Sequence, residues 1–375
     1  MEKGKKITKR KSVDFILLIA TVSLVFIGIV MVFSSSWPEA MVEFDNGYYF
    51  LKKQLQSSIA GFAAMIICMN INYKFFKKYA LPLFLLAQFS GLLLFTPLGL
   101  ELKGATRWIN LGFTTFMPSD AIKIGSLIFF AKFLADRKDN LGTLLKGTIP
   151  AIFLIGISCI IILMQPDLGT TVTLGATLMA MFFVAGMKIS HLVFMVGGAA
   201  GFLFYAITGE GNEYRMRRWT TFLDPFKDKL GDGWQVVQSL YALGSGGLFG
   251  LGLGKSRQKF FYIPEAYNDF IFSIIGEELG LVGTLLVLFL FFVVIWRGII
   301  IALKTEDLFG CYLASGITAL ITVQSLINIA VVTSSIPTTG ITLPFISYGG
   351  TSLLFYMASI GILLNISRYA KLDRS

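Results

Sequence analysis

Asp269 is the residue of this chain best suited to acid–base chemistry. It lies in the run Pro-Glu-Ala-Tyr-Asn-Asp-Phe-Ile-Phe, residues 264–272, where a long polar stretch gives way to an apolar segment. A carboxylate at the boundary of an apolar segment loses hydration unless something compensates, so its presence there indicates a functional role. Asp and Asn are also preferred helix N-cap residues, so Asn268 or Asp269 would fit that position. The sequence leaves the catalytic and the capping interpretations open.

Two shorter runs also place charge beside apolar sequence. The run Lys-Gly-Ala-Thr-Arg-Trp-Ile-Asn contains Lys103 and Arg107, which suit substrate binding or anchoring at a membrane interface. The run Met-Pro-Ser-Asp-Ala-Ile-Lys opens a predicted helix in which Asp120 and Lys123 are i and i+3 neighbours. In one interpretation, Asp120 and Lys123 form an ordinary local ion pair. In the other, the pair lies near a low-dielectric core and maintains the geometry of a site, because removing one partner would leave the other charge buried without compensation.

A long polar stretch, residues 209–268, is rich in basic side chains. In one interpretation, this many cations beside a membrane bind an anionic ligand such as a phosphate-bearing lipid. In the other, the stretch is a solvated loop whose acidic residues balance its basic residues. Both interpretations fit its bases, which are Arg215, Arg217, Arg218, Lys227, Lys229, Lys255, Arg257 and Lys259. The glycine-rich run 244–254 leads into a P-loop-like ending, but the first glycine of that pattern would fall on Phe249. Its glycines instead predict close backbone packing or a re-entrant segment.

Composition sets the class of protein. Of the 375 residues, 55% are hydrophobic and only 14% are charged, which predicts an integral membrane protein. A bilayer requires about 20 apolar residues per helical span, so we expect an all-α polytopic protein with about ten transmembrane helices. The eighth is too long for one straight span, so its first turns, through Glu277 and Glu278, should lie in a hydrated or protein-lined entrance. The predicted spans are 13–35, 55–72, 79–98, 119–135, 148–164, 170–186, 191–208, 269–301, 309–333 and 350–367.

The distribution of basic residues predicts the orientation. The N-terminal tail, residues 1–12, is rich in Lys and Arg, and with ten spans the other basic short connections and the C-terminus fall on the same side. Both termini are therefore expected in the cytosol, with the chain embedded in the cytoplasmic membrane. The stretch 209–268 becomes a large extracytoplasmic loop between the seventh and eighth helices. We expect one transmembrane domain covering residues 1–375.

The chain has few candidate metal ligands. His191 is the only histidine, and the three cysteines lie in separate apolar segments without metal-ligand spacing: Cys68, Cys159 and Cys311. The sequence therefore predicts no dedicated metal site in the protein, and nothing in it suggests nucleic-acid binding.

An ordered series of motifs runs along nearly the whole chain. Its members lie at residues 103–109, 165–170, 214–218, 222–225, 238–250, 264–280 and 343–350, the last reading Leu-Pro-Phe-Ile-Ser-Tyr-Gly-Gly. In content and order the series resembles the SEDS family of shape, elongation, division and sporulation proteins, and the run Ser-Arg-Gln-Lys at 256–259 is closer to its FtsW and SpoVE branch than to RodA. The resemblance implies a ten-helix peptidoglycan glycosyltransferase that polymerises lipid II at the outer face of the membrane. It also implies a class B penicillin-binding protein as partner, in cell division or sporulation.

The resemblance also assigns roles to particular residues. The catalytic carboxylate of the family maps onto Asp269, and its functionally important charged positions map onto Lys103, Asp120 and Lys123. The family usually has Glu where this chain has Asp120, so the reach of that carboxylate toward Lys123 is shorter here.

The implied chemistry is an inverting glycosyl transfer. Asp269 would accept the proton of a sugar 4-hydroxyl, and the leaving undecaprenyl pyrophosphate needs positive charge. Candidates for that charge are Mg²⁺ or Mn²⁺ held mainly by the substrate pyrophosphate, and the cations Lys103, Arg107, Arg215 and Arg218. Glu277 lies eight residues after Asp269 and could line the same entrance, whereas Glu278 should point nearly the opposite way.

Two other functions compete with polymerisation. A lipid II flippase would suit the same membrane lipid, but transporters often show inverted repeats and interrupted helices, and the two halves of this chain show no clear correspondence. A non-catalytic scaffold for the penicillin-binding protein would leave Asp269 and the basic loop without chemical purpose.

Overall fold

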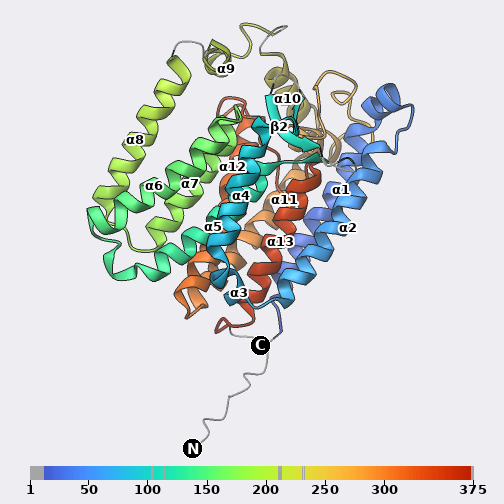
Figure 1. Cartoon of the computed structure of the whole chain (residues 1–375). Coiled ribbons are helices and arrows are strands. Elements are labelled where there is room, and N and C mark those ends of the chain that lie inside the picture. The colour runs from blue at the N-terminus through green and yellow to red at the C-terminus, as the bar shows by residue number, and fades with distance from the viewer. Residues whose placement is uncertain are drawn as a thin grey trace, which may run out of the picture.

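The computed structural model describes residues 12–102, 105–110, 112, 115–209, 213–229, 231 and 233–372. Its helices run mostly side by side in one bundle (Figure 1). Helical structure occupies each of the ten predicted spans, which confirms the polytopic α-helical fold. In chain order the spans correspond to α1 (Phe15–Phe44), α2 (Tyr49–Asn70), the pair α3 (Tyr73–Lys78) and α4 (Ala80–Leu92), α5 (Pro118–Asp136), α6 (Ile149–Leu163), α7 (Leu168–Val184), α8 (Ile189–Thr208), α11 (Ile271–Lys304), α12 (Leu308–Val332) and α13 (Gly350–Ser367).

The outer helices expose apolar side chains. In the described residues, six helical stretches are long and apolar enough to cross a membrane, and the shorter stretches Ala80–Phe95 and Leu168–Val184 are also apolar. Helix α8 lies at the edge of the bundle (Figure 1) and buries only Met195 and Ala206. An apolar helix with so little protein contact requires an apolar surrounding, which a lipid bilayer provides.

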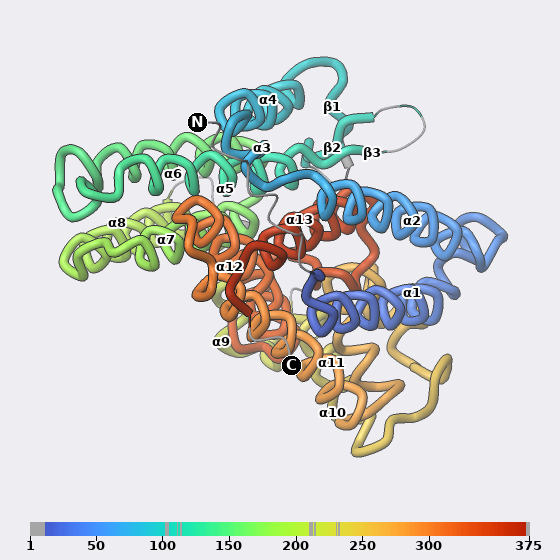
Figure 2. The backbone as a smooth tube through the Cα atoms, turned by 90° about the horizontal axis from the view of Figure 1, so that it is seen from below, coloured from blue at the N-terminus to red at the C-terminus, as the bar shows by residue number. Residues whose placement is uncertain are grey.

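Helix α13 lies in the middle of the bundle (Figure 2). It packs against α2, α5 and α12, and most of its side chains from Tyr356 onward are buried. Gly361 faces the backbone of Met65 in α2, where a larger residue would not fit. Close helix contact through a small residue is common where lipid, and not water, surrounds the bundle.

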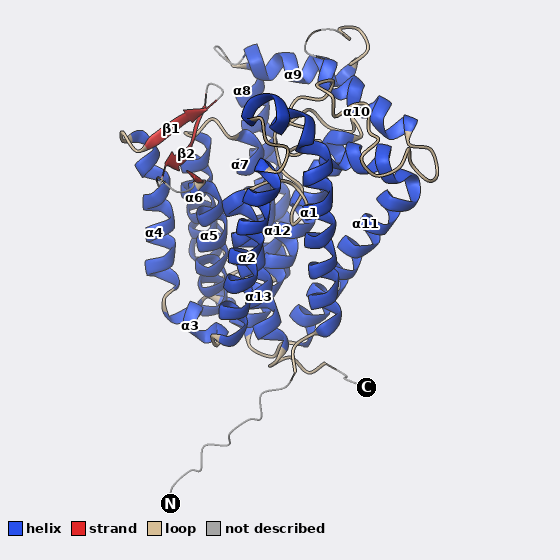
Figure 3. Ribbon diagram, turned by 90° about the vertical axis from the view of Figure 1, so that its right-hand side faces the viewer, coloured by secondary structure: helices blue, strands red, loops and turns tan. Residues whose placement is uncertain are grey.

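The two ends of the described chain meet at one end of the bundle. The backbone N–H of Asp14 donates to Ser367 Oγ (3.1 Å), and the Asp14 carboxylate forms an ion pair with Arg297 of α11. The opposite end carries the sheet and helices α9 and α10 (Figure 3). This arrangement follows from an even number of spans.

The polar connections contain more regular structure than the sequence predicted. Stretch 209–268 includes α9 (Glu213–Leu223) and α10 (Trp234–Ser245). The connection before α5 forms a small antiparallel sheet in the order β1-β2-β3, where we had expected only helices. Its strands are β1 (Gly99–Leu102), β2 (Ala105–Asn110) and β3 (Thr115–Phe116), with Ile109 opposite Gly99 and Phe116. The run Thr-Arg-Trp-Ile in β2 has three residues that favour strands, and a β-bulge interrupts its pairing.

Helix α11 is broken at Gly280, whose φ of 68° and ψ of −164° are not helical. The backbone groups freed by the break pair with the glycine-rich run 244–254. Four hydrogen bonds make this joint: Leu281 N to Gly247 O (2.9 Å), Val282 N to Leu248 O (3.1 Å), Leu251 N to Glu277 O (2.9 Å) and Gly252 N to Glu278 O (3.0 Å). Close backbone packing of the glycine-rich run is thus confirmed, and so is a protein-lined environment for Glu277 and Glu278, both buried.

Candidate functional site

Asp269 lies directly before the broken helix α11. The N-cap of α11 is Phe270, which makes no side-chain capping hydrogen bond, so the capping interpretation of Asp269 is wrong. The Asp269 side chain is half-buried.

The backbone that carries Asp269 is held at three successive carbonyl groups. Tyr348 N donates to the carbonyl of Tyr267 (3.0 Å), and Ser347 Oγ donates to that of Asn268 (2.7 Å). Asn328 Nδ2 donates to the carbonyl of Asp269 itself (2.8 Å). Because the donors come from α12 and from the connection before α13, distant parts of the chain fix this one segment.

A glycine lies against the Asp269 carboxylate. A Cβ built on Gly340 would lie 3.4 Å from Asp269 Oδ2, and the φ of Gly340 is +72°. Residues other than glycine are strained at that φ. Gly340 therefore brings the 338–343 backbone close to the carboxylate.

Aromatic side chains pack behind the segment. Phe50 of α2 lies 4.5 Å from the ring of Tyr267 and 5.3 Å from that of Tyr348, measured between centroids. Burial, and then the Glu39 carboxylate, raise the pKa of Tyr267, so its neutral hydroxyl donates to Glu39 Oε1 (3.1 Å). Burial and the nearby Tyr49 raise the pKa of Tyr348 to about 12. Both phenols are neutral at physiological pH and add no charge beside Asp269.

The predicted pair on α5 is present and buried. Lys123 Nζ lies 2.8 Å from Asp120 Oδ1, and both side chains are less than a tenth exposed. Thr351 at the start of α13 donates to Asp120 Oδ2 (3.5 Å) and accepts from Met117 N (3.3 Å). Asp120 thus reaches its partner despite its short side chain, and the pair joins α5 to α13.

Arg107, Arg215 and Arg218 lie at the end of the bundle that carries the sheet, α9 and α10 (Figure 3). Arg107 of β2 donates to the backbone carbonyls of Gln165 and Pro166, just before α7. Arg215 donates to the carbonyl of Ala206 (3.0 Å), and Arg218 donates to that of Thr338 (2.9 Å). Lys103 lies outside the described residues. Of these cations, Arg218 contacts the 338–343 segment that borders Asp269.

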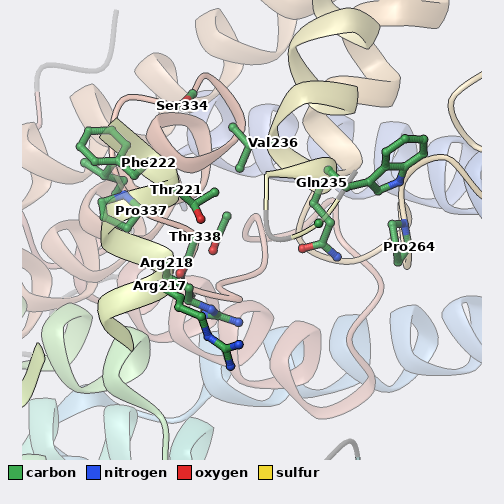
Figure 4. Close-up of a pocket in the computed structure, with 13 residues that line it drawn as sticks. Arg217, Arg218, Thr221, Phe222, Gln235, Val236, Pro264, Ser334, Pro337 and Thr338 are labelled. Carbon is green, nitrogen blue, oxygen red and sulfur yellow. Dashed lines mark hydrogen bonds between the residues drawn. The ribbon is translucent and has the colours of Figure 1, made fainter. Parts of the chain in front are cut away.

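A cavity of about 360 Å³ lies between α9, α10 and the residues that follow α12 (Figure 4). Arg217 and Arg218 project side by side, while Phe222 and Pro337 lie together on one side and Gln235 on the other. This lining combines cationic, amide and apolar groups.

Glu277 and Glu278 contact the same segment, residues 256–259. Glu277 accepts from Ser256 Oγ and from the backbone N–H groups of Arg257 (2.9 Å) and Gln258 (3.3 Å). Glu278 pairs with Lys259 Nζ (2.9 Å) and accepts from Ser34 Oγ. The predicted divergence of the two carboxylates is wrong, because the segment wraps around the helix just before its break. The hydrogen bonds of Glu277 hold the segment 256–259 against α11 next to the break at Gly280. The prediction that Glu277 lines the same entrance as Asp269 stays a prediction.

Several residues that hold the site together were not predicted from the sequence. They are Ser34, Gln324, Asn328, Gly340, Ser347 and Tyr348, whereas Lys259 was named only as one of the basic residues of stretch 209–268. Among them, Ser347 and Tyr348 belong to a motif quoted for the family resemblance, and a buried amide in an apolar helix, such as Gln324, is a usable signal. Among the described residues, no three His, Cys, Asp or Glu side chains gather in a metal-binding group.

Comparisons with known proteins identify the family. The model of the FtsW, RodA and SpoVE family, described as cell cycle protein, matches residues 15–372. The chain belongs to this family. Stage V sporulation protein E of Bacillus subtilis is 44% identical over 366 residues, covering 97% of this chain and 99% of that protein. A probable peptidoglycan glycosyltransferase FtsW of Geobacter sp. (strain M18) is 41% identical over 355 residues, covering 94% and 96%.

Solved structures support the same membership in the FtsW, RodA and SpoVE family. A chain from a peptidoglycan synthase complex that coordinates polymerization and crosslinking has a TM-score of 0.79 at 27% identity, covering 96% of this chain and 99% of that chain. The rod shape determining protein RodA of Thermus thermophilus has a TM-score of 0.70 at 25% identity, covering 96% and 98%. The similarity extends over the whole bundle.

Proposed function

We propose that this protein is a peptidoglycan glycosyltransferase that polymerises lipid II, with Asp269 as general base. The observation that carries the proposal is the half-buried Asp269 in a segment, residues 267–269, whose carbonyl groups are held by Tyr348, Ser347 and Asn328. Holding a base in one orientation lowers the barrier to proton transfer. The names of the FtsW relatives, probable peptidoglycan glycosyltransferase, support the same activity.

The reaction joins two sugars with inversion at one carbon. The 4-hydroxyl oxygen of one sugar attacks the anomeric carbon of the other, and the bond from that carbon to undecaprenyl pyrophosphate breaks on the opposite face. The leaving pyrophosphate takes the electron pair, and the Asp269 carboxylate takes the hydroxyl proton. Proton removal by a positioned carboxylate contributes about 10²- to 10⁴-fold to a rate.

The pyrophosphate requires positive charge as it departs. Arg217 and Arg218 line the cavity that borders the 338–343 segment, and Arg107 and Arg215 lie at the same polar end of the bundle. Lys103, which lies outside the described residues, stays a candidate from the sequence. Mg²⁺ or Mn²⁺ held mainly by the substrate phosphates would supply further positive charge.

We also propose the orientation of the bundle in the membrane. Both termini would lie in the cytosol, which the basic N-terminal tail and the even number of spans support. The end with the sheet, α9 and α10 then lies outside, where translocated lipid II is available. The similarity to a chain of a synthase complex that also crosslinks supports a class B penicillin-binding protein as partner, in division or sporulation.

The break in α11 favours a lipid II flippase, because transporters often use interrupted helices. In transporters the freed backbone groups face the cargo. Here, four of those groups, two on each side of Gly280, pair with the glycine-rich run 244–254. We therefore favour the polymerase.

Polymerisation of lipid II by the purified full-length protein tests the proposal. The assay compares the protein with and without its cognate penicillin-binding protein, in the presence of moenomycin, which targets a different glycosyltransferase class. A moenomycin-resistant glycan ladder supports the polymerase. Absence of product under every condition, together with lipid II translocation in proteoliposomes, would favour the flippase instead.

A further inference from the structure

Helix α12 directs two amide side chains at the segment that borders Asp269. Gln324 and Asn328 are four residues apart, so they lie on the same face of the helix. Both side chains are almost fully buried. Buried amides in a membrane helix are costly unless they are hydrogen-bonded, so their partners indicate their purpose.

Asn328 joins Asp269 to the adjacent segment. Its Nδ2 donates one hydrogen to the carbonyl of Asp269 (2.8 Å) and the other to that of Ile341 (2.7 Å). Two carbonyl acceptors fix the orientation of the amide, because the flipped group would point its oxygen at two other oxygens. The backbone of Asp269 is thereby tied to the residue that follows Gly340.

Gln324 joins the same segment to the buried ion pair. Its Nε2 donates to the carbonyl of Thr342 (3.0 Å). Its Oε1 accepts from the Tyr356 hydroxyl and from Lys123 Nζ (3.3 Å). One side chain therefore connects α5 and α13 to the backbone beside Asp269.

The hydrogen bonds of Lys123 decide how that residue acts. Its ammonium has three hydrogens, and three acceptors surround it: Asp120 Oδ1 (2.8 Å), Gln324 Oε1 (3.3 Å) and Tyr356 Oη (3.4 Å). The side chain is only about a twentieth exposed. An ammonium engaged in this way has no hydrogen left for a substrate phosphate.

We infer that Gln324 and Asn328 are positioning residues for Asp269, and that Lys123 acts through Gln324 and not by binding pyrophosphate. The path runs from the pair Asp120–Lys123 through Gln324 to the 340–342 backbone, and from there through Asn328 to Asp269. The inference rests on the proposed role of Asp269 as base. Misplacing a reacting group by about 1 Å lowers turnover by about 10²-fold, so small shifts along this path matter.

The Gln324→Glu variant tests the inference. Glu keeps an acceptor for Lys123 and Tyr356 but cannot donate to Thr342, whereas Gln324→Met loses both functions. We expect Gln324→Glu to lower kcat by about 10²-fold while KM for lipid II changes by less than about threefold. Deuterium exchange at the backbone amides of residues 340–343 should become faster, a readout that does not require catalysis.

Ser325→Ala is the matched control on α12, because Ser325 Oγ bonds only within its own helix, to the Thr322 carbonyl. The double variant Asp120→Asn with Lys123→Met separates positioning from binding without stranding a charge. It should lower kcat and leave lipid II affinity unchanged, whereas a phosphate-binding lysine would raise KM.

Wild-type turnover in folded Gln324→Glu, or a loss expressed wholly in KM, would overturn the positioning role. Asp269→Asn, assayed in parallel, keeps the two proposals distinguishable. An inactive Asp269→Asn beside a fully active Gln324→Glu refutes only the positioning role. An active Asp269→Asn refutes the role of Asp269 as base. It then also refutes the proposal that Gln324 and Asn328 act in catalysis by positioning Asp269.

Discussion

Gly250 and Gly280 lie backbone against backbone at the break in α11. A Cβ built on Gly250 would come within 2.7 Å of the amide nitrogen of Gly280, and both residues have φ values in the left-handed region, +78° and +68°. The first part of α11 begins just after Asp269 and ends at this joint. The contact between the two glycines therefore fixes the helix segment that follows the proposed base.

Alanine at Gly280 should destabilise the protein. Its Cβ would lie 2.6 Å from the Leu248 carbonyl oxygen in a backbone conformation that disfavours side chains. We expect a loss of about 2 kcal/mol or more, measured as a lower midpoint of thermal unfolding in detergent. Gly156→Ala in α6 is the matched control, since a Cβ there meets no atom within 4 Å. Equal midpoints in the two variants would argue against a tight joint.

Removing Lys259 should leave a buried charge without its partner. Glu278 is fully buried and pairs with Lys259 Nζ at 2.9 Å. Lys259→Met is expected to destabilise the protein by about 3–5 kcal/mol, and adding Glu278→Gln should restore much of the loss. Lys371→Ala, which removes an exposed pair with Glu306, should leave the unfolding midpoint unchanged. No recovery in the double variant would show that the charge is not the cause.

Asp269→Asn should abolish glycan polymerisation and preserve binding of lipid II and of the penicillin-binding protein. Asn has nearly the size of Asp but cannot accept the proton, so we expect turnover to fall by about 10²- to 10⁴-fold. Gel analysis of the glycan ladder, together with co-purification of the partner, measures both effects. Near wild-type polymerisation by the variant would remove Asp269 as the base and reopen the flippase and scaffold functions.

The proposed orientation predicts which positions a membrane-impermeant maleimide reaches. In a background without native cysteines, Cys at position 229 should be labelled in intact protoplasts and Cys at position 191 should be protected. His191 lies at the start of α8, and α9 follows the other end of that helix, so the two positions report opposite ends of the bundle. The reverse labelling pattern would invert the topology and place Asp269 on the cytosolic side.

The family and the ten spans could be predicted from the sequence because they depend on local properties. Runs of about 20 apolar residues must form helices in a bilayer whatever their neighbours are, since no water is present to bond an open backbone. The pairing of Asp120 with Lys123 is equally local, because three residues in a helix bring two side chains together. Asp269 was chosen as the candidate base from its type and its place at the start of an apolar segment, and that role stays a prediction.

Only the tertiary structure decided what surrounds Asp269. The residues that contact Asp269 or its neighbour Asn268, namely Asn328, Gly340 and Ser347, lie about 60 to 80 positions further along the chain, and no periodicity relates them to Asp269. The surroundings of Glu277 and Glu278 were also decided by the tertiary structure. Helical geometry alone predicted that the two side chains point in nearly opposite directions, whereas both contact the segment 256–259. Sequence spacing determines which residues share a helix face, whereas contacts between elements depend on how the whole chain packs.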